Sequence, residues 1–322
     1  MPQPTVGQVH INRPLTNVSV AYVQSADSFI AGKVFPSIAV DKKSDILLKY
    51  TKHDWMRDDA KIRAPGTEAT ESGFNIDTSD TYKCVRHDLK RVIPDDLRDN
   101  ADEPMDMDMD STEFLTQQLL IRKERIWAST HFVDAVWGTS KSPGVDAEMG
   151  TLWSDYINSD PAKDVKYGRG TILTNTGRKP NTIAAGWNVA EYLADHPLIL
   201  SRFQFRDKNI VTKDLLALLF QVKDFHVCEA VYSASVEGNS SPTYSLIQGD
   251  HMLLCYVEPS PSKMRPSAGY TFNWKKFAGN NEGMRVKKYR NEDRESDMIE
   301  VAMSTDMKLV CTDCGFFYHT AV

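Results

Sequence analysis

The sequence has no apolar stretch long enough to cross a bilayer as a helix. Its longest unbroken apolar runs, residues 215–220 and 252–257, are six residues each, whereas a membrane-spanning helix needs about 20. The N-terminal region contains Pro2, Pro4 and Pro14 and lacks the basic start and apolar stretch of a secretory signal. These absences exclude a helical membrane protein and argue against secretion by that route.

Cysteine is too sparse for a disulfide framework. The 322 residues contain five cysteines, whereas disulfide-stapled domains are short and carry an even number. We therefore expect a reducing, cytoplasmic environment. The 17 glycines and 15 prolines fall far below the roughly 25–30% that is typical of low-complexity chains. The composition is that of a folded protein, and the length predicts about two domains.

Positive charge is not concentrated in any region. The chain has 38 Lys and Arg against 44 Asp and Glu, a formal net charge of −6, and it lacks the clustered cations of a nucleic-acid-binding domain. Contact with nucleic acid should therefore be weak and local.

Common catalytic patterns are also missing. The chain contains no G-x-S-x-G, P-loop, H-E-x-x-H or G-x-G-x-x-G sequence, and its eight histidines are scattered singly. We predict no catalytic residue, no metal ligand and no cofactor, and hence a protein that is not an enzyme.

Two local patterns resemble metal or redox sites without matching them. Cys311 and Cys314 form a C-x-x-C pair, but strand-like residues flank it, and residues three apart on a strand face opposite sides. The carboxylates of Asp106, Asp108 and Asp110 resemble the start of a calcium loop, but the glycine and the final glutamate of that loop are absent. We expect small buried cysteines and a helix N-terminus that favours acidic residues.

The first half of the chain predicts three segments. Residues 1–41 form an extended arm with little core of its own, because prolines interrupt it. Residues 42–91 carry many charges and few large apolar side chains, as expected of a projecting hairpin. Residues 111–137 form a helix about 40 Å long, with Asp110 as its N-cap. Its apolar face would contain Phe114, Leu115, Leu119, Ile126, Val133 and Trp137.

The second half predicts a compact α/β unit followed by strands. Asp160 and Pro161 begin a helix that ends at Gly177. Further helices are expected at 188–195 and 213–221, and strands at 182–185, 225–231, 244–257, 270–274, 298–303 and 308–318.

Several segments, in this order, resemble the major capsid proteins of tailed bacteriophages with the Hong Kong 97-type fold. They are residues 15–22, 33–36, 57–67, 180–182, 230–232, 267–274 and 315–317. The resemblance implies an α+β fold with an N-terminal arm (1–41), an extended hairpin loop (42–90), a peripheral domain (91–159 and 259–310) with spine helix 111–137, and an axial domain (160–258) joined by the last strand (311–322).

The same resemblance implies a structural protein that forms hexamers and pentamers in an icosahedral shell around double-stranded DNA. Its expected partners are further copies of itself, a portal protein, loosely bound packaged DNA, and a separate scaffolding or decoration protein where one is present. No membrane partner is expected. The arm starts at Met1 without a charged helical leader, so we expect no maturation cleavage. The protein would be made and assembled in the bacterial cytoplasm and reside in the virion.

The hairpin charges are the candidate site. We predict that five of them form ion pairs between subunits where capsomers meet. Each exposed pair would contribute little to the free energy of assembly, but many such pairs over a shell would set how neighbouring subunits align. The five residues are Asp54, Arg57, Asp58, Asp59 and Arg63.

Two other interpretations remain open. An encapsulin-like nanocompartment would have the same fold and would enclose cargo enzymes instead of DNA. A soluble α/β enzyme built on residues 160–258 would leave the arm and the hairpin unexplained.

Overall fold

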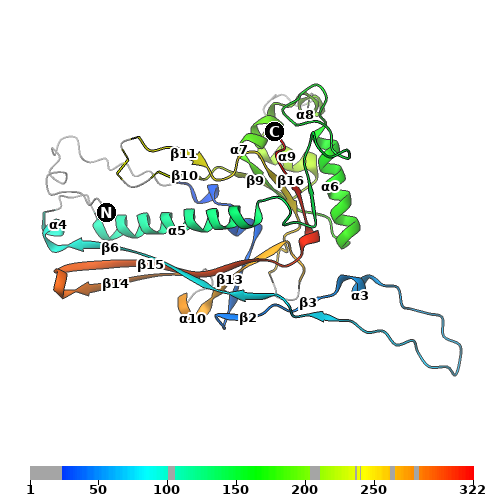
Figure 1. Cartoon of the computed structure of the whole chain (residues 1–322), viewed down its shortest axis with the longest axis horizontal. Helices are drawn as coiled ribbons and strands as arrows, with labels where there is room; N and C mark the ends of the chain where they lie inside the picture. Colours follow the sequence, from blue (N-terminus) through cyan, green and yellow to red (C-terminus); the bar gives the residue numbers. More distant parts are fainter. Residues whose placement is uncertain are drawn as a thin grey trace.

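The computed structural model describes residues 24–100, 106–203, 211–235, 238–239, 241–261, 265–278 and 283–322. Within them, two five-stranded β-sheets, three two-stranded ones, a long helix and a projecting hairpin form an elongated molecule (Figure 1). The first 23 residues of the predicted arm, including 15–22, lie outside the described residues.

The first sheet has five strands arranged around the long strand β15 (Ser296–Leu309). The N-terminal part of β15 pairs with β6 (Val85–Pro94) on one side and β14 (Met284–Asn291) on the other, both antiparallel. Its C-terminal part pairs with β13 (Gly269–Trp274), which in turn runs parallel to β1 (Ser37–Val40). Residues 85–90 of the predicted hairpin loop therefore lie in a sheet strand.

The helix α5 (Met107–His131) packs along β6 and β15 (Figure 1). The prediction of a helix over 111–137 capped by Asp110 was wrong at both ends. Asp106 is the N-cap, because its side chain accepts hydrogen bonds from the backbone N–H groups of Asp108 and Met109. At the other end the chain leaves the helix, and Trp137 folds back to donate from Nε1 to the carbonyl oxygen of His131 at 2.7 Å.

The apolar face of α5 is narrower than predicted. Leu115 and Leu119 are buried against Ile299, Val301 and Met303 of β15. Phe114, which was assigned to the same face, is 53% exposed, because it lies one residue, about 100° of helical rotation, from Leu115. The helix reaches the second core through Trp127, which is fully buried.

The second sheet joins five strands in the order β7 (Thr139–Lys141), β16 (Gly315–Tyr318), β12 (Met252–Cys255), β8 (Thr182–Gly186) and β9 (Asp224–Cys228). Four helices flank it: α6 (Pro161–Thr176), α7 (Trp187–Asp195), α8 (Pro197–Arg202) and α9 (Lys213–Phe220). Every residue of β8, β12 and β16 is buried.

The helix signals in this region are confirmed. The side chain of Asp160 accepts from the backbone N–H of Lys163, Pro161 occupies the first turn, and Gly177 ends α6 with φ 68°. The predicted strands 225–231 and 244–257 each break in two. Their outer parts, β10 (Val231–Ser233) and β11 (Tyr244–Leu246), form a separate antiparallel ribbon.

The segment 308–318 is not one strand, as predicted, but the crossing from the first sheet to the second. After β15 the chain makes a 3-10 turn, η3 (Thr312–Cys314), before β16 begins. Cys311 and Cys314 therefore lie at the two ends of one turn, and their thiols interact. A hydrogen bond from Cys314 lowers the pKa of Cys311 to about 7, and the same bond raises the pKa of Cys314.

Shorter helical elements lie between these units. They are η1 (Ala26–Ser28), α2 (Ala31–Val34), α4 (Asp95–Asp99), α10 (Lys275–Ala278) and η2 (Glu292–Arg294).

Candidate assembly interface

The hairpin, residues 42–84, projects from the body of the molecule (Figure 1). Two short ladders hold its arms together: β2 (Ser44–Ile46) with β5 (Thr81–Lys83), and β3 (Lys49–Tyr50) with β4 (Ile76–Asp77). One short helix, α3 (Lys52–Met56), follows β3. Every residue from 60 to 81 is exposed, so the outer half of the hairpin has no core within its own chain.

The base of the hairpin is fixed to the body. Tyr82 stacks on Phe272 of β13 with ring centroids 4.7 Å apart. The Nζ of Lys52 lies 2.7 Å from a carboxylate oxygen of Asp313, and the backbone N–H of Lys83 donates to the carboxylate of Asp306 at 2.8 Å. The hairpin therefore leaves the body in a defined direction.

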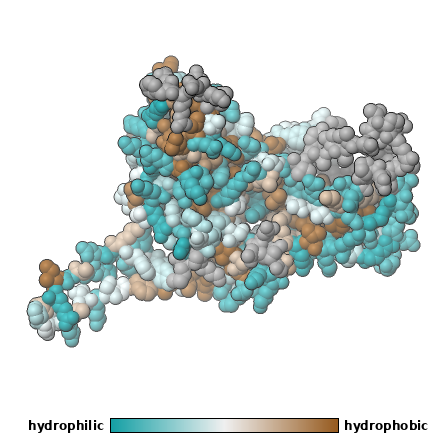
Figure 2. Space-filling view, turned by 180° about the vertical axis from the view of Figure 1, so that it is seen from behind, coloured by the Kyte–Doolittle hydropathy of each residue, from teal (hydrophilic) through white to brown (hydrophobic). Residues whose placement is uncertain are grey.

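Three aromatic side chains form an exposed cluster on the hairpin. The rings of Tyr50, Trp55 and Phe74 lie 5.5, 5.7 and 6.0 Å apart, centroid to centroid. Trp55 is 65% exposed and Phe74 is 59% exposed. Figure 2 shows the hairpin standing clear of the body, with hydrophobic side chains among hydrophilic ones. Contiguous exposed apolar groups of this kind mark interaction surfaces.

The five predicted charges divide into a group that forms ion pairs within the chain and a group that does not; in the second group, Arg63 donates from Nε to the carbonyl oxygen of Thr67. Arg57 Nη2 lies 2.6 Å from Asp59, and Arg57 Nη1 lies 3.9 Å from Asp54. Hydrogen bonds from Arg57 and from Ser72 lower the pKa of the Asp59 carboxyl. Within the described residues, Asp58 and Arg63 form no ion pair. The structure therefore already satisfies three of the five charges inside one chain, and the inter-subunit contacts stay a prediction.

A buried carboxylate that sequence analysis missed joins the N-terminal segment to α5. Glu124 accepts hydrogen bonds from the backbone N–H groups of Ile30 and Ala31, at 3.2 and 3.0 Å, where no local side chain caps α2. Burial raises the pKa of Glu124, and the bonds from Ala31 and Ile30 partly offset that rise. Glu124 lies three residues before Trp127, so both lie on the buried face of α5. This spacing is the signal in the sequence that could have identified Glu124.

Residues 24–40 lie on the body of their own chain. Ile30, Val34 and Phe35 belong to the core around Trp127. The side-chain amide of Gln24 both donates to the carbonyl of Val231 and accepts from its N–H, at 2.7 and 2.9 Å. This part of the predicted arm therefore has defined contacts.

The one buried serine–histidine contact among the described residues is not arranged for catalysis. The Nδ1 of His196 accepts a hydrogen bond from the backbone N–H of Leu198, so Nε2 carries the proton and donates to the Ser159 hydroxyl at 2.9 Å. A protonated Nε2 cannot take a proton from that hydroxyl. In the same part of the chain, no group of three or more His, Cys, Asp or Glu side chains is placed to hold a metal, and no helix is long and apolar enough to cross a membrane.

No family model matches the chain. Among curated proteins, it is 25% identical over 313 residues to the major capsid protein of Burkholderia phage BcepMu, and the match covers 94% of each chain.

Solved structures share its fold. A phage-related protein of Bordetella bronchiseptica RB50 superposes with a TM-score of 0.69 at 21% identity, covering 92% of this chain and 94% of the other. The capsid of Cyanophage P-SCSP1u superposes with a TM-score of 0.60 at 10% identity, covering 96% of this chain and 92% of the other. The holo-SrpI encapsulin complex of Synechococcus elongatus PCC 7942 superposes with a TM-score of 0.52 at 11% identity, and the match covers 99% of each chain. The chain therefore has a mixed α/β fold that phage capsid proteins and an encapsulin share.

Proposed function

We propose that this chain is the major capsid protein of a tailed bacteriophage, which self-assembles as hexamers and pentamers into the icosahedral head around the double-stranded DNA genome. The match to the BcepMu major capsid protein carries the proposal, because it extends over 94% of both chains. A shared single motif would not extend so far. The role is structural, and the protein resides in the virion after synthesis and assembly in the bacterial cytoplasm.

We further assign the chain to the Hong Kong 97-type fold. Residues 1–41 act as the arm, 42–90 as the extended hairpin loop, 91–159 with 259–310 as the peripheral domain, and 160–258 with 311–322 as the axial domain. The separation into two sheets, with α5 along the first and four helices beside the second, supports this assignment.

The hairpin contacts a neighbouring subunit in this proposal. The exposed rings of Trp55 and Phe74 lose water against the neighbour, and such aromatic groups often dominate the energy of an interface. Asp58 and Arg63 pair with charges of that neighbour, while the pairing of Arg57 with Asp59 and Asp54 holds the hairpin in shape.

Other partners follow from the role. A portal protein occupies one vertex, and a separate scaffolding or decoration protein assists where one is present. Packaged DNA contacts the inner face loosely, because a chain of net charge −6 lacks the broad basic surface of tight DNA binding.

The test is sedimentation with negative-stain imaging of the native protein, co-expressed with its neighbouring genes. Shells of uniform diameter, far heavier than the 36.3 kDa of one chain, are expected. A folded monomer that stays soluble with those partners would contradict the proposal.

An encapsulin-like shell is the second candidate, favoured by the shared fold with the SrpI complex. The contents of purified shells separate the two candidates. Double-stranded DNA in shells from infected cells supports the capsid, and an enclosed enzyme supports the nanocompartment.

A further inference from the structure

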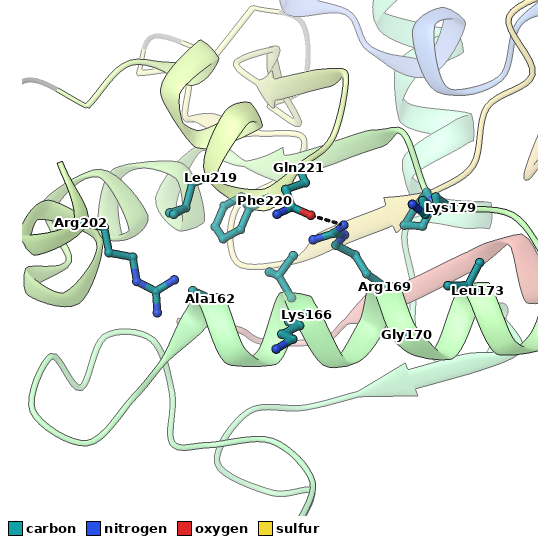
Figure 3. Close-up of a pocket in the computed structure, with 12 residues that line it drawn as sticks. Ala162, Lys166, Arg169, Gly170, Leu173, Lys179, Arg202, Leu219, Phe220 and Gln221 are labelled. Carbon is teal, nitrogen blue, oxygen red and sulfur yellow. Dashed lines mark hydrogen bonds between the residues drawn. The ribbon is translucent and has the colours of Figure 1, made fainter.

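A cavity of about 440 Å³ opens between α6 and α9 in the region of the second sheet (Figure 3). Its floor is apolar where Val165 and Phe220 are buried, and the partly exposed Leu173 lines its far end. The volume lies within the roughly 300–1,000 Å³ of small-molecule sites. It therefore admits a ligand larger than a single inorganic anion.

Four cationic side chains line this cavity. Lys166 and Arg169 lie three residues apart on α6, Lys179 follows that helix, and Arg202 comes from the end of α8 (Figure 3). None of the described lining residues is acidic. Among the described residues, Arg202 also lies near one carboxylate outside the lining, with its Nη2 3.7 Å from an oxygen of Asp160. In a chain of net charge −6, this is a local excess of positive charge.

One of the four cations is held in place. Arg169 Nη2 donates to the side-chain oxygen of Gln221 at 2.7 Å (Figure 3). Gln221 has φ 53° and is the C-cap of α9, so its backbone position is set by the end of that helix. A guanidinium fixed through one nitrogen keeps its other N–H groups for an anion, and its planar fork matches phosphate oxygens.

We propose that this cavity binds a phosphate ester, with the phosphate at the Arg169 guanidinium, positive charge added by Lys166 and the other lining cations, and an apolar or flat group against Val165 and Phe220. Four cations without an acidic lining residue favour a multiply charged anion over a single carboxylate. The phosphate can come from a free nucleotide or from the backbone of a nucleic acid. The inference does not depend on shell assembly.

The experiment titrates the native full-length protein with adenosine triphosphate in one series and with a short single-stranded DNA oligonucleotide in another. Binding is measured by calorimetry at low and at moderate salt. We expect at least one probe to bind, with an affinity that falls as salt rises. The double variant Lys166→Gln/Arg169→Gln should weaken it by about tenfold or more.

Lys163→Gln is the matched control, because Lys163 is exposed on the same helix but does not line the cavity. It should change the affinity by less than about twofold. Lys179→Gln is a second lining variant, in case the double variant alters folding; it should also weaken binding.

The two probes, nucleotide and oligonucleotide, identify the source of the phosphate. Binding of the nucleotide that both lining variants weaken supports a free phosphate ester, and binding of the oligonucleotide alone supports a nucleic acid backbone. Three results would overturn the proposal: no binding in either arm, an equal loss in Lys163→Gln, or equal competition by polyglutamate, which would indicate an acidic protein segment as the occupant.

Discussion

The second sheet and the hairpin use their apolar side chains in opposite ways. In β8, β12 and β16 every residue is buried, so the sheet is stabilised by contacts within one chain. In the hairpin, Trp55 and Phe74 are more than half exposed. Exposed aromatic area gains nothing until water is removed from it, so these two rings add little to the stability of the single chain. The difference separates a region that is stabilised within one chain from a region whose exposed rings are covered on assembly in the function proposed above.

The largest effect is expected in the second sheet. Leu254 of β12 is fully buried in the core that contains Phe316 and Ile183. Leu254→Ala should lower the free energy of unfolding of the unassembled chain by about 2–5 kcal/mol, because it leaves a cavity in a packed core. Urea unfolding measures this. A loss of less than about 1 kcal/mol in the free energy of unfolding would contradict the interpretation that the second sheet is stabilised within one chain.

A somewhat smaller effect is expected where the N-terminal segment joins the body. Glu124→Ala leaves the N–H groups of Ile30 and Ala31 without their acceptor, and each buried unsatisfied group costs about 1–3 kcal/mol. We expect a total loss of about 2–4 kcal/mol. Glu113→Ala, at an exposed position on the same helix, is the control and should change little. Equal losses in the two variants would refute the role of Glu124.

The same carboxyl predicts a pH dependence. Burial raises the pKa of Glu124 in the folded chain, so between the unfolded and the folded pKa the folded state binds more protons. The contribution of this group to the free energy of unfolding therefore rises as pH falls through that window. Glu124→Gln cannot titrate, so lowering the pH from neutral should shift the stability difference in favour of the wild type. A difference that is constant with pH would contradict this.

Sequence analysis succeeded where the signals are local. Asp160, Pro161 and Gly177 define the two ends of α6 by backbone chemistry within one turn. It failed at the start of α5, where several acidic residues compete for the N-cap. Asp106 takes the N-cap, and Asp108, in the first turn, pairs instead with Arg98 and with Lys288 of β14.

Long-range contacts explain the other failures. The partners of Glu124 are 93 and 94 residues away along the chain, and no sequence pattern encodes such a distance. The turn at Cys311 exists because the chain crosses between two sheets there. For the hairpin charges, the contacts between subunits stay a prediction, and no sequence pattern separates Arg57, which pairs within its own chain, from Arg63.

The hairpin aromatics should affect assembly and leave the single chain unchanged. In Trp55→Ala/Phe74→Ala the urea midpoint of the unassembled chain should not move, because both rings are exposed. The fraction of protein in shells should fall by about tenfold, since buried aromatic anchors dominate interfaces. Sedimentation velocity at fixed concentration measures it. Tyr244→Ala, which removes a 66% exposed ring from β11, is the control. An equal fall in the fraction of protein in shells for this variant would contradict a specific role of the hairpin aromatics in assembly.

The smallest effect separates the two arginines of the hairpin. Arg63 has no ion-pair partner within the described residues, whereas Arg57 is paired with Asp59. Arg63→Gln should therefore slow or weaken shell assembly by about twofold to fivefold at low salt, and the difference from the wild type should vanish at high salt, because salt screens exposed charges. Arg57→Gln should change assembly less, since its partners lie in its own chain. If Arg63→Gln assembles like the wild type at low salt, Arg63 faces solvent in the shell, and the aromatic cluster alone directs the hairpin to its neighbour.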